Sequence, residues 1–550
     1  MVWRIDDPQG NEAQKIMWEL VKYTRGRVLD IGCGNFKAFP HFIGLDNGTD
    51  IVKFGHQMKP DIMIDDATDL RLFNSEAYDA VFSSHLLEHI PQENVVKALK
   101  EWLRVLKVGG YLCLYLPDET LYPKVGEPGA NPDHKWNVSY KLMIELMEKA
   151  GCWDLVDWQR RDQDNEYSLF FAFKKTHKGH TFSCSNPKPS KTAAIVRYGA
   201  YGDLLQMSSV AAGLKAEGYH VTLYGSPPGV DVILHDPNID EFYLQDKDQV
   251  PNHALAPYWE YHRKKYDRWV NLSESVEGQL LALPGRSNHE LPPALREEMM
   301  HHNYLEFQHR MAKLPHVPRV KYFSTPDEQA WAKAERAKMG EFVIVWSLAG
   351  SSVHKVWPYV DQVIMGLLLE FTDVHVVLVG GDAAVLLEQG WFHVNEDGTP
   401  KRDERKRKLQ TDRRVHCLSG DWSIRETMAF CEQVDMVVGP ETGVLNGVAQ
   451  LDMPKLVFLS HSTEYNLTRD WVNVYPMRAK GTVCPGRGNN EAKACHQLHY
   501  GWQHCKNALD AEGKPMGIAQ CQAEITSEEV FGTIHGLISK ALDAKKAAAA

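Results

Sequence analysis

The segment Ile195-Val196-Arg197-Tyr198-Gly199-Ala200-Tyr201-Gly202-Asp203 decides how this 550-residue chain is read. Two β-branched residues open the segment and predict a strand. Two glycines and an acid follow, and residues 204–214 then carry apolar residues at helical spacing. A strand, a glycine turn and a helix start together let a ligand approach a helix N-terminus. We therefore expect one nucleotide-binding module before this segment and a second, larger one that begins with it.

The composition predicts a cytoplasmic globular protein. Hydrophobic residues make up 43% of the chain and charged residues 24%, and the length predicts two or three domains. The net charge of −11 argues against a dedicated nucleic-acid binder. No apolar run approaches the ~20 residues that span a bilayer, so we expect no membrane span. The N-terminus also lacks the basic-then-apolar pattern of a signal peptide.

Before the central segment, residues 28–34 read Val-Leu-Asp-Ile-Gly-Cys-Gly, a strand followed by a glycine turn. The glycines let the backbone pass close to a ligand. The next two predicted strands end in acids, at Asp46 and Asp66. A carboxylate at such a strand end can accept both hydroxyls of a ribose. The remaining predictions for this module are a strand running into a helix over 78–90, a helix, a Gly-Gly turn and a strand over 103–114, and a last strand over 167–173.

Together these segments resemble a class I S-adenosylmethionine-dependent methyltransferase, over roughly the first 175 residues. Only eleven residues separate the second glycine of the turn from the acid of the second strand, so we expect a very short first crossover helix or a loop. The resemblance implies that the methionine part of the cofactor is surrounded by Asp30, Gly32 and Gly34, the ribose is held by Asp46, and the adenine amino group is held by Asp66.

The acceptor side of such a fold follows the fifth strand, where this chain reads Asp133-His134-Lys135-Trp136. Methyl transfer depends mostly on proximity and orientation, and a base is needed when the acceptor is a hydroxyl. We predict that His134 is this base, because imidazole titrates near neutral pH. The alternative is a surface histidine, one of 25 in the chain. We predict structural roles for His85 and His89, and no metal site.

Residues 176–190 are rich in Ser, Pro, Lys and Asn and predict a linker after a methyltransferase domain at 1–175. Two further α/β halves are expected, an acceptor lobe at 191–330 and a donor lobe at 331–545. Ligands of open α/β sheets bind at the carboxyl ends of the strands. The predicted elements are strands at 195–198, 219–225, 239–243, 267–272, 342–347, 374–381, 435–439 and 455–459, and helical patterning over 292–314.

Two stretches of the donor lobe suggest transfer of a group from a diphosphate-activated donor. Ser347 opens a small, hydroxyl-rich loop that Lys355 follows, and such a loop offers backbone N–H groups and a cation to phosphates. Glu441-Thr442-Gly443 opens a helix whose dipole favours negative charge. The alternative for this second stretch is an ordinary helix cap.

Residues 191–542 resemble the family-nine glycosyltransferases, the ADP-heptose:lipopolysaccharide heptosyltransferase group, which have a two-lobed B-type fold. The resemblance implies an inverting, metal-independent transfer from a nucleoside-diphosphate sugar. This chain departs from the family at Glu441, where aspartate is usual, and at Asn446, where histidine is usual. The implied roles are a general base at Asp203, a phosphate contact at Lys355, pyrophosphate contacts at Thr442 and Gly443, and a sugar or ribose contact at Glu441.

We therefore predict a bifunctional α/β enzyme, with one Rossmann-like methyltransferase domain and two Rossmann-like glycosyltransferase halves. The expected acceptor is a saccharide or glycolipid, such as a bacterial surface polysaccharide. One alternative is glycosylation of a hydroxymethylated base in phage DNA. The basic insertion at 392–414 would then contact the nucleic acid, whereas otherwise we expect it to be a solvated loop. Another is that one module is an inactive scaffold.

The late cysteines lack Cys-x-x-Cys zinc spacing. A metal site, a disulfide or a family-specific structural element stay open for Cys484, Cys495, Cys505 and Cys521.

Overall fold

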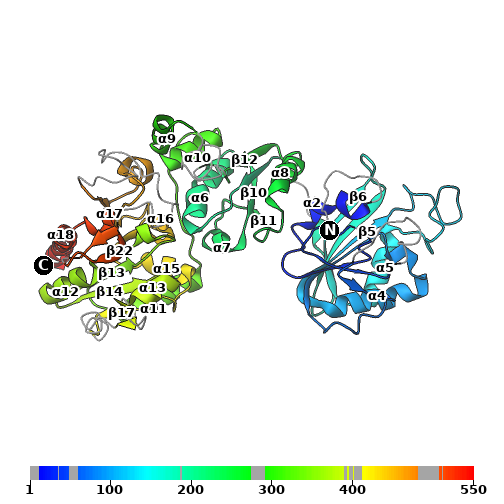
Figure 1. The fold of residues 1–550 in the computed structure, drawn as a ribbon, viewed down its shortest axis with the longest axis horizontal. Coiled ribbons are helices and arrows are strands. Elements are labelled where there is room, and N and C mark those ends of the chain that lie inside the picture. The colour runs from blue at the N-terminus through cyan, green and yellow to red at the C-terminus, as the bar shows by residue number, and fades with distance from the viewer. Residues whose placement is uncertain are drawn as a thin grey trace. The chain divides into compact units, whose positions relative to one another are not determined.

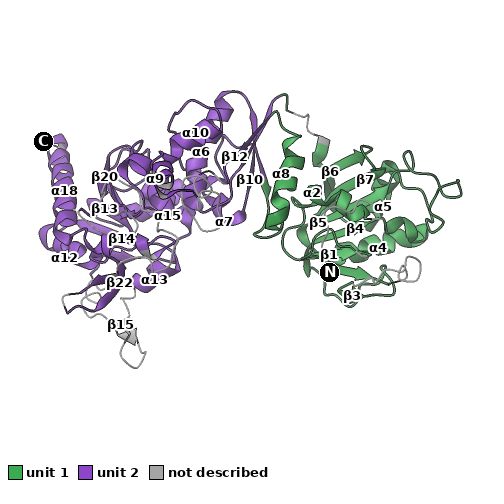
Figure 2. Ribbon diagram, turned by 45° about the horizontal axis from the view of Figure 1, so that its top comes forward, with its two compact units in different colours: residues 1–190, 243–267 green, residues 191–242, 268–550 purple. Residues whose placement is uncertain are grey.

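The chain forms two compact units, residues 1–190 with 243–267 and residues 191–242 with 268–550 (Figure 2). Each unit is described by itself. The computed structural model describes residues 11–34, 36–48, 60–185, 189–273, 275, 291–388, 393–394, 400–401, 412–480, 507–510 and 512–549.

Unit 1 is built on an eight-stranded sheet with the order β3-β2-β1-β4-β5-β7-β6-β8. The first five strands are parallel, in the order of a doubly wound nucleotide-binding sheet, and β7 runs antiparallel to β5. The strands are β1 (Val28–Ile31), β2 (Ile43–Asp46), β3 (Ile62–Met63), β4 (Tyr78–Ser84), β5 (Leu106–Pro117), β6 (Trp153–Arg161), β7 (Ser168–Lys175) and β8 (His180–Phe182).

Two helices cover one face of this sheet, α4 (Gln92–Val105) and α5 (Tyr140–Ala150) (Figure 1). Val95, Leu99 and Trp102 recur at helical spacing along α4 and are fully buried in the core of the unit. Burial of such side chains contributes about 1.5–3 kcal/mol each. No helix lies between β1 and β2 among the described residues, which confirms the expectation of a loop there.

The predicted Gly-Gly turn lies inside β5 instead of before it. The helix ends at Val105 and the strand begins at Leu106, and the pairing with β4 shifts register between Tyr78 and Ala80. Gly109 has a φ of +82°, which only glycine adopts without strain. The two glycines therefore form an irregularity inside a long strand. The sequence does not reveal this, because apolar residues flank the pair on both sides.

The described residues of unit 2 contain two small two-stranded sheets, β15 (His393–Val394) with β16 (Pro400–Lys401) and β21 (Asn507–Leu509) with β22 (Pro515–Ala519), and two larger sheets. The first larger sheet has the order β11-β10-β9-β12, and the second is a parallel sheet with the order β17-β14-β13-β18-β19-β20. The predicted fold class, with one Rossmann-like domain followed by two Rossmann-like halves, is confirmed. The strands are β9 (Thr192–Val196), β10 (His220–Gly225), β11 (Glu241–Leu244), β12 (Arg268–Asn271), β13 (Phe342–Ser347), β14 (Val374–Val379), β17 (Val415–Cys417), β18 (Met436–Pro440), β19 (Lys455–Phe458) and β20 (Val474–Met477).

The helices of unit 2 lie beside these sheets (Figure 1). In the C-terminal half, Trp357 stacks on Phe458 with ring centroids 4.7 Å apart, and its indole N–H donates to the Ile525 carbonyl at 3.0 Å. None of the helices in the described ranges is both long and apolar enough to cross a bilayer. The main helices are α6 (Tyr201–Ala216), α10 (Tyr304–Met311), α11 (Pro326–Arg336), α12 (Val360–Glu370), α15 (Ile424–Cys431), α16 (Gly443–Gly447) and α18 (Ser527–Ala549).

Residues 243–267, which interrupt unit 2 in the sequence, pack in unit 1. The sequence does not signal this feature. Their helix α8 (Leu255–Arg263) packs against α2 (Met17–Leu20), where Trp18 meets the Tyr258 ring at 5.7 Å between centroids. The predicted boundaries at 175, 190 and 330 stay predictions, and this excursion interrupts the predicted acceptor lobe.

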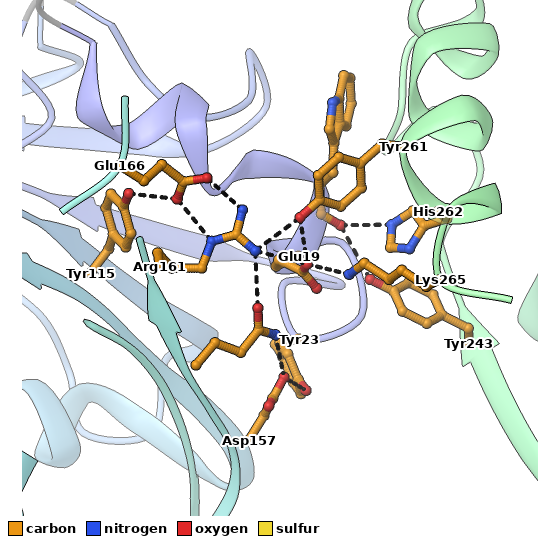
Figure 3. Close-up of polar contacts among 12 residues, drawn as sticks. Glu19, Tyr23, Tyr115, Asp157, Arg161, Glu166, Tyr243, Tyr261, His262 and Lys265 are labelled. Carbon is orange, nitrogen blue, oxygen red and sulfur yellow. Dashed lines mark hydrogen bonds and ion pairs between the residues drawn. The ribbon is translucent and has the colours of Figure 1, made fainter. Parts of the chain in front are cut away.

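A buried polar network joins the excursion to the rest of unit 1 (Figure 3). Glu19, whose side chain is 6% exposed, accepts hydrogen bonds from Lys265, from the Tyr261 hydroxyl at 2.6 Å and from Arg161 at 3.4 Å. Arg161 also pairs with both oxygens of Glu166, at 2.6 and 2.8 Å. Burial alone would raise the pKa of Glu19, but the ammonium of Lys265 lowers it to about 2.

Candidate functional site

The glycine turn of unit 1 and the acid of the second strand come together at the carboxyl ends of β1 and β2, as predicted. Gly32 and Gly34 have φ angles of +77° and +54°. A Cβ on Gly32 would lie 2.8 Å from the Leu86 side chain. The Gly34 amide donates to Asp46 Oδ2 at 3.1 Å, and the Gly48 amide donates to Oδ1 at 2.8 Å. Since a carboxylate has about four lone-pair sites, Asp46 can accept two further hydrogen bonds.

Asp30 lies within β1 and is 1% exposed. Its Oδ2 accepts a hydrogen bond from the Ala38 amide at 3.3 Å, whereas the buried Oδ1 accepts none from any described residue. Burial raises the pKa of Asp30 to about 7, and this amide and the charge of Lys37 oppose the rise only in part. A buried acceptor atom beside a glycine turn fits a cationic ligand, which would compensate its charge.

Asp66 lies three residues beyond β3, and its side chain is exposed. Its two oxygens accept from the Thr68 amide at 2.8 Å and from the Thr68 hydroxyl at 2.9 Å. Met63 is the register partner of Asp46, so the two predicted cofactor acids follow neighbouring strands at one edge of the sheet.

A cluster of histidines and one glutamate occupies the predicted acceptor side. Glu88 is fully buried, and its Oε1 lies 3.7 Å from His134 Nε2 and 3.5 Å from His85 Nδ1. The His89 and His134 rings are 4.9 Å apart between centroids. Ligand atoms of Glu88, His89 and His134 all lie within 4.8 Å of one another. The segment Leu87-Glu88-His89 is one of those that carry the methyltransferase resemblance, but no role was predicted for Glu88, although the spacing His85-x-x-Glu88-His89 offered a signal.

His134, the predicted base, is 8% exposed. Burial, with the neighbouring His89, lowers the pKa of His134 to about 4, and burial raises the pKa of Glu88 to about 8. The imidazole of His134 is therefore neutral at pH 7. Its unprotonated ring nitrogen can accept a proton or bind a cation.

The predicted general base of unit 2, Asp203, lies in the first turn of α6. Its Oδ1 accepts from Arg197 Nη2 at 2.7 Å and its Oδ2 accepts from the Ala200 amide at 2.9 Å. Arg197 is fully buried, whereas the Asp203 side chain is 29% exposed. A Cβ on Gly199 would lie 2.6 Å from Asp203 Oδ2, so this glycine makes room for the carboxylate. Asp203 thus caps the helix, and its carboxylate is partly open to solvent.

The predicted donor residues meet at the carboxyl ends of β13 and β18. Ser347 is 2% exposed, and its hydroxyl lies 3.4 Å from that of Thr442. The Lys355 side chain packs against Gly350, because a Cβ added to Gly350 would lie 2.5 Å from Lys355 Cδ. Trp357, anchored in the core, fixes the end of this loop. The structure therefore brings Ser347 and Thr442 together, and Lys355 lies near enough to Glu441 for its charge to act on that carboxyl group.

Glu441 is 4% exposed, and its carboxylate accepts hydrogen bonds from the loop that follows β19. It accepts from the Ser460 amide, from the Ser462 hydroxyl at 2.9 Å and from His461 Nδ1 at 2.7 Å. Burial alone would raise the pKa of Glu441, but His461 and the charge of Lys355 lower it to about 2. Its oxygens are thus committed to the protein.

The helix starts of the two lobes touch in unit 2. A Cβ on Gly443 would lie 2.7 Å from Tyr201 Cβ, and a Cβ on Gly202 would lie 3.3 Å from Asn446 Nδ2. Asn446 Oδ1 accepts from Gln206 at 3.2 Å, and its Nδ2 donates to the Thr442 carbonyl at 2.9 Å. The helix α16 has only five residues, so its dipole is short.

Two features predicted from the sequence fall mostly outside the described residues. Of the basic insertion, only residues 393–394, 400–401 and 412–414 are described. Cys484, Cys495 and Cys505 lie outside the described residues, and Cys521 lies in the short helix α17 (Gln520–Ala523).

Comparison with known proteins bears mainly on unit 1. Residues 29–114 match the family model described as a methyltransferase domain. "Probable tRNA methyltransferase 9B" of Mus musculus is 32% identical over 95 residues, which are 16% of this chain and 21% of that protein. The chain thus spans about a fifth of the length of the curated relatives that it matches.

Two solved structures are similar to larger parts of the chain. A glycosyl transferase family 9 protein from Veillonella parvula is 12% identical, with a TM-score of 0.39, and covers 52% of this chain and 86% of its own. The ADP-heptose lps heptosyltransferase II of E. coli is 13% identical, with a TM-score of 0.40, and covers 64% of this chain and 99% of its own. Residues 29–114 of the chain therefore carry a methyltransferase domain.

Proposed function

We propose that this chain is a bifunctional transferase, an S-adenosylmethionine-dependent methyltransferase joined to an inverting, metal-independent glycosyltransferase. The glycosyltransferase uses a nucleoside-diphosphate sugar and acts on a saccharide or glycolipid, such as a bacterial surface polysaccharide. One observation supports the second activity above all. The acceptor-side carboxylate Asp203 and the donor-side hydroxyl Thr442 lie at two helix starts that touch at Gly202 and Gly443.

For methyl transfer, the glycine turn and three acids hold S-adenosylmethionine, whose sulfonium supplies the methyl group. The unpartnered Asp30 Oδ1, beside Gly32 and Gly34, accepts from the cationic methionine part. The two remaining lone-pair sites of Asp46 suit the ribose hydroxyls, and Asp66 suits the adenine amino group. His134, on the acceptor side, offers its neutral ring nitrogen to the acceptor hydroxyl or to a cation that binds it.

For glycosyl transfer, Asp203 accepts the proton of the acceptor hydroxyl. Arg197 fixes one carboxylate oxygen of Asp203 through the ion pair at 2.7 Å, which orients the base towards the acceptor. Lys355, Ser347 and Thr442 hold the donor diphosphate, and the lysine charge stabilises the leaving group. Because the oxygens of Glu441 are committed to residues 460–462, we assign this acid the role of positioning that loop beside the donor.

Two substitutions at Asp203 separate a base from a helix cap. Asparagine keeps an oxygen that can accept from the Ala200 amide, whereas alanine removes it. We expect Asp203→Asn and Asp203→Ala both to bind the donor nucleotide as wild type does and to lose transfer at least a hundredfold. Mass spectrometry of products across a nucleotide-sugar panel measures transfer, and calorimetry measures donor binding. Full transfer by Asp203→Asn would leave Asp203 as a helix cap only.

Titration of the full chain with S-adenosylmethionine tests the other activity. We expect Asp46→Asn to weaken binding about tenfold or more, because one oxygen is replaced by an amide that cannot accept. The matched control is Asp69→Asn, since Asp69 pairs with the exposed Arg71 on the protein surface. Absence of binding by wild type would refute the cofactor assignment.

A further inference from the structure

We infer that Glu88, His89 and His134 bind one divalent transition-metal ion on the acceptor side of the methyltransferase unit. Binding of the ion follows from these residues alone, whereas its role in methyl transfer rests on the proposed function.

The spacing of the three side chains suits a common ion. Bonds of about 2.0–2.2 Å in a tetrahedral arrangement place ligand atoms about 3.4 Å apart. Glu88 Oε1 lies 3.7 Å from His134 Nε2, and ligand atoms of all three residues lie within 4.8 Å of one another. Closure onto an ion therefore requires side-chain movements of about 1 Å or less.

Glu88 points to a ligand independently of this spacing. It is fully buried, and neither of its oxygens accepts a hydrogen bond from a described residue. A buried carboxylate without a donor or a counter-charge costs several kcal/mol, so such groups are normally paired or bound to a metal. A cation between Glu88 and His134 would compensate the charge of the ionised carboxylate.

The backbone around the cluster is already fixed. The Lys135 amide donates to the Glu88 carbonyl at 2.8 Å, which ties the loop of His134 to the turn of Glu88. The Trp136 indole donates to the carbonyls of Leu87 and Ile90 at 3.3 and 3.1 Å. Glu88 and His134 are 46 residues apart in sequence, and these bonds hold the two segments together before any ion binds.

His85 supports the carboxylate from its other side. Its Nδ1 lies 3.5 Å from Glu88 Oε1, and its Nε2 lies 3.0 Å from the Ser168 hydroxyl. Outer residues of this kind orient metal ligands in proteins. His85 is thus a positioning residue, or a fourth ligand if the ring turns.

The donor set selects the class of ion. Two imidazoles and one carboxylate suit zinc, manganese, iron(II) or cobalt, whereas magnesium and calcium prefer oxygen ligands. A three-residue set leaves positions open, as catalytic metal sites do. His89 is only partly buried, so the open side is reachable from solvent.

The site also lies next to the glycine turn. A Cβ on Gly32 would touch the side chain of Leu86, two residues before Glu88. An acceptor hydroxyl bound to the ion loses its proton to water at near-neutral pH. Its oxygen then attacks the sulfonium methyl carbon, so that an O–C bond forms as the S–C bond breaks. The products are the methyl ether, the thioether and one proton.

The test is metal binding by the full chain, without cofactor or acceptor. After chelation and dialysis, cobalt(II) is titrated in and followed by its visible absorption bands, and zinc is titrated by calorimetry. We expect wild type to bind with a Kd below about 1 μM. Glu88→Gln and His134→Gln should each bind at least a hundredfold more weakly and lose the cobalt bands.

The matched control is His177→Gln, an exposed histidine of the same unit, which should bind as wild type does. His89→Gln, at a partly exposed position, serves if a buried variant fails to fold, and S-adenosylmethionine titration of each variant checks the fold. Unchanged binding in folded Glu88→Gln and His134→Gln, or a wild-type Kd above about 100 μM, would overturn the assignment. Binding of metal without any binding of S-adenosylmethionine would refute the methyltransferase role and leave the metal site standing.

Discussion

Replacing Glu19 by glutamine removes the charge at the centre of the network that joins residues 243–267 to unit 1 (Figure 3). The side chain keeps its size and can still accept from the Tyr261 hydroxyl. What is lost is the interaction of the carboxylate with Lys265 and Arg161.

The magnitude follows from the pKa of Glu19, which is about 2 against an ordinary 4.5. Each pKa unit corresponds to about 1.4 kcal/mol, so the ionised carboxylate contributes about 3 kcal/mol at pH 7. Lys265 is 38% exposed, and solvent screening makes this an upper figure. Because the folded pKa is depressed, the contribution is complete above pH 4.5 and is lost as the pH falls from 4.5 towards 2.

Hydrogen exchange of the full chain, read by mass spectrometry, measures the effect locally. In peptides from α8 (Leu255–Arg263), Glu19→Gln should raise exchange about a hundredfold at pH 7, after correction for intrinsic rates. The difference should shrink towards pH 3. The control is Glu260→Gln on the same helix, where the pair with Arg263 is exposed and no change is expected. Unchanged α8 protection in Glu19→Gln at pH 7, or a difference at pH 3 as large as that at pH 7, would refute the reasoning.

Three further substitutions test the sites. Gly32→Ala places a side chain at a φ of +77° against a leucine, and calorimetry should show a tenfold or greater loss of S-adenosylmethionine binding. Gly443→Ala meets the Cβ of Tyr201 at 2.7 Å, so glycosyl transfer should fall while thermal unfolding shifts downwards; Gly532→Ala, with open space around it, should do neither. Glu441→Gln should raise proteolysis of the 460–463 loop at pH 7, and the difference should vanish as the pH falls from 4.5 towards 2, since the folded pKa is about 2.

The strands that carry the predicted sites could be found in the sequence because each is short, apolar and buried. β1, β9 and β13 are buried along nearly their whole length, and each ends at a small residue or a glycine turn. The 3.6-residue and continuous apolar patterns that identify helices and buried strands are local properties of the chain. The alternation of these strands and helices along the chain then predicted three successive α/β modules.

The polar clusters could not be found in the same way, because their members are far apart in the sequence. Glu19 and Lys265 are 246 residues apart, and Glu88 and His134 are 46 apart. A single polar residue within an apolar segment gives no signal of its partner. The prediction placed residues 243–267 in the acceptor lobe because nothing in their sequence signals the contacts that they make with unit 1.

The two departures from the family-nine pattern have structural counterparts within unit 2. Glu441 has a longer side chain than the usual aspartate, and it reaches the Ser460 amide, the Ser462 hydroxyl and His461. Asn446 replaces a histidine and accepts from Gln206 on the opposite lobe.

Each substituted residue is therefore satisfied by a contact on which the loop or the lobe packing depends. Ser347 and Thr442 still lie together at the strand ends, and the charge of Lys355 still acts on Glu441. Under the proposed glycosyl transfer, we therefore expect a changed fit around the donor rather than an inactive scaffold, and a donor panel for this chain should include sugars and nucleotides beyond those of the resembled family.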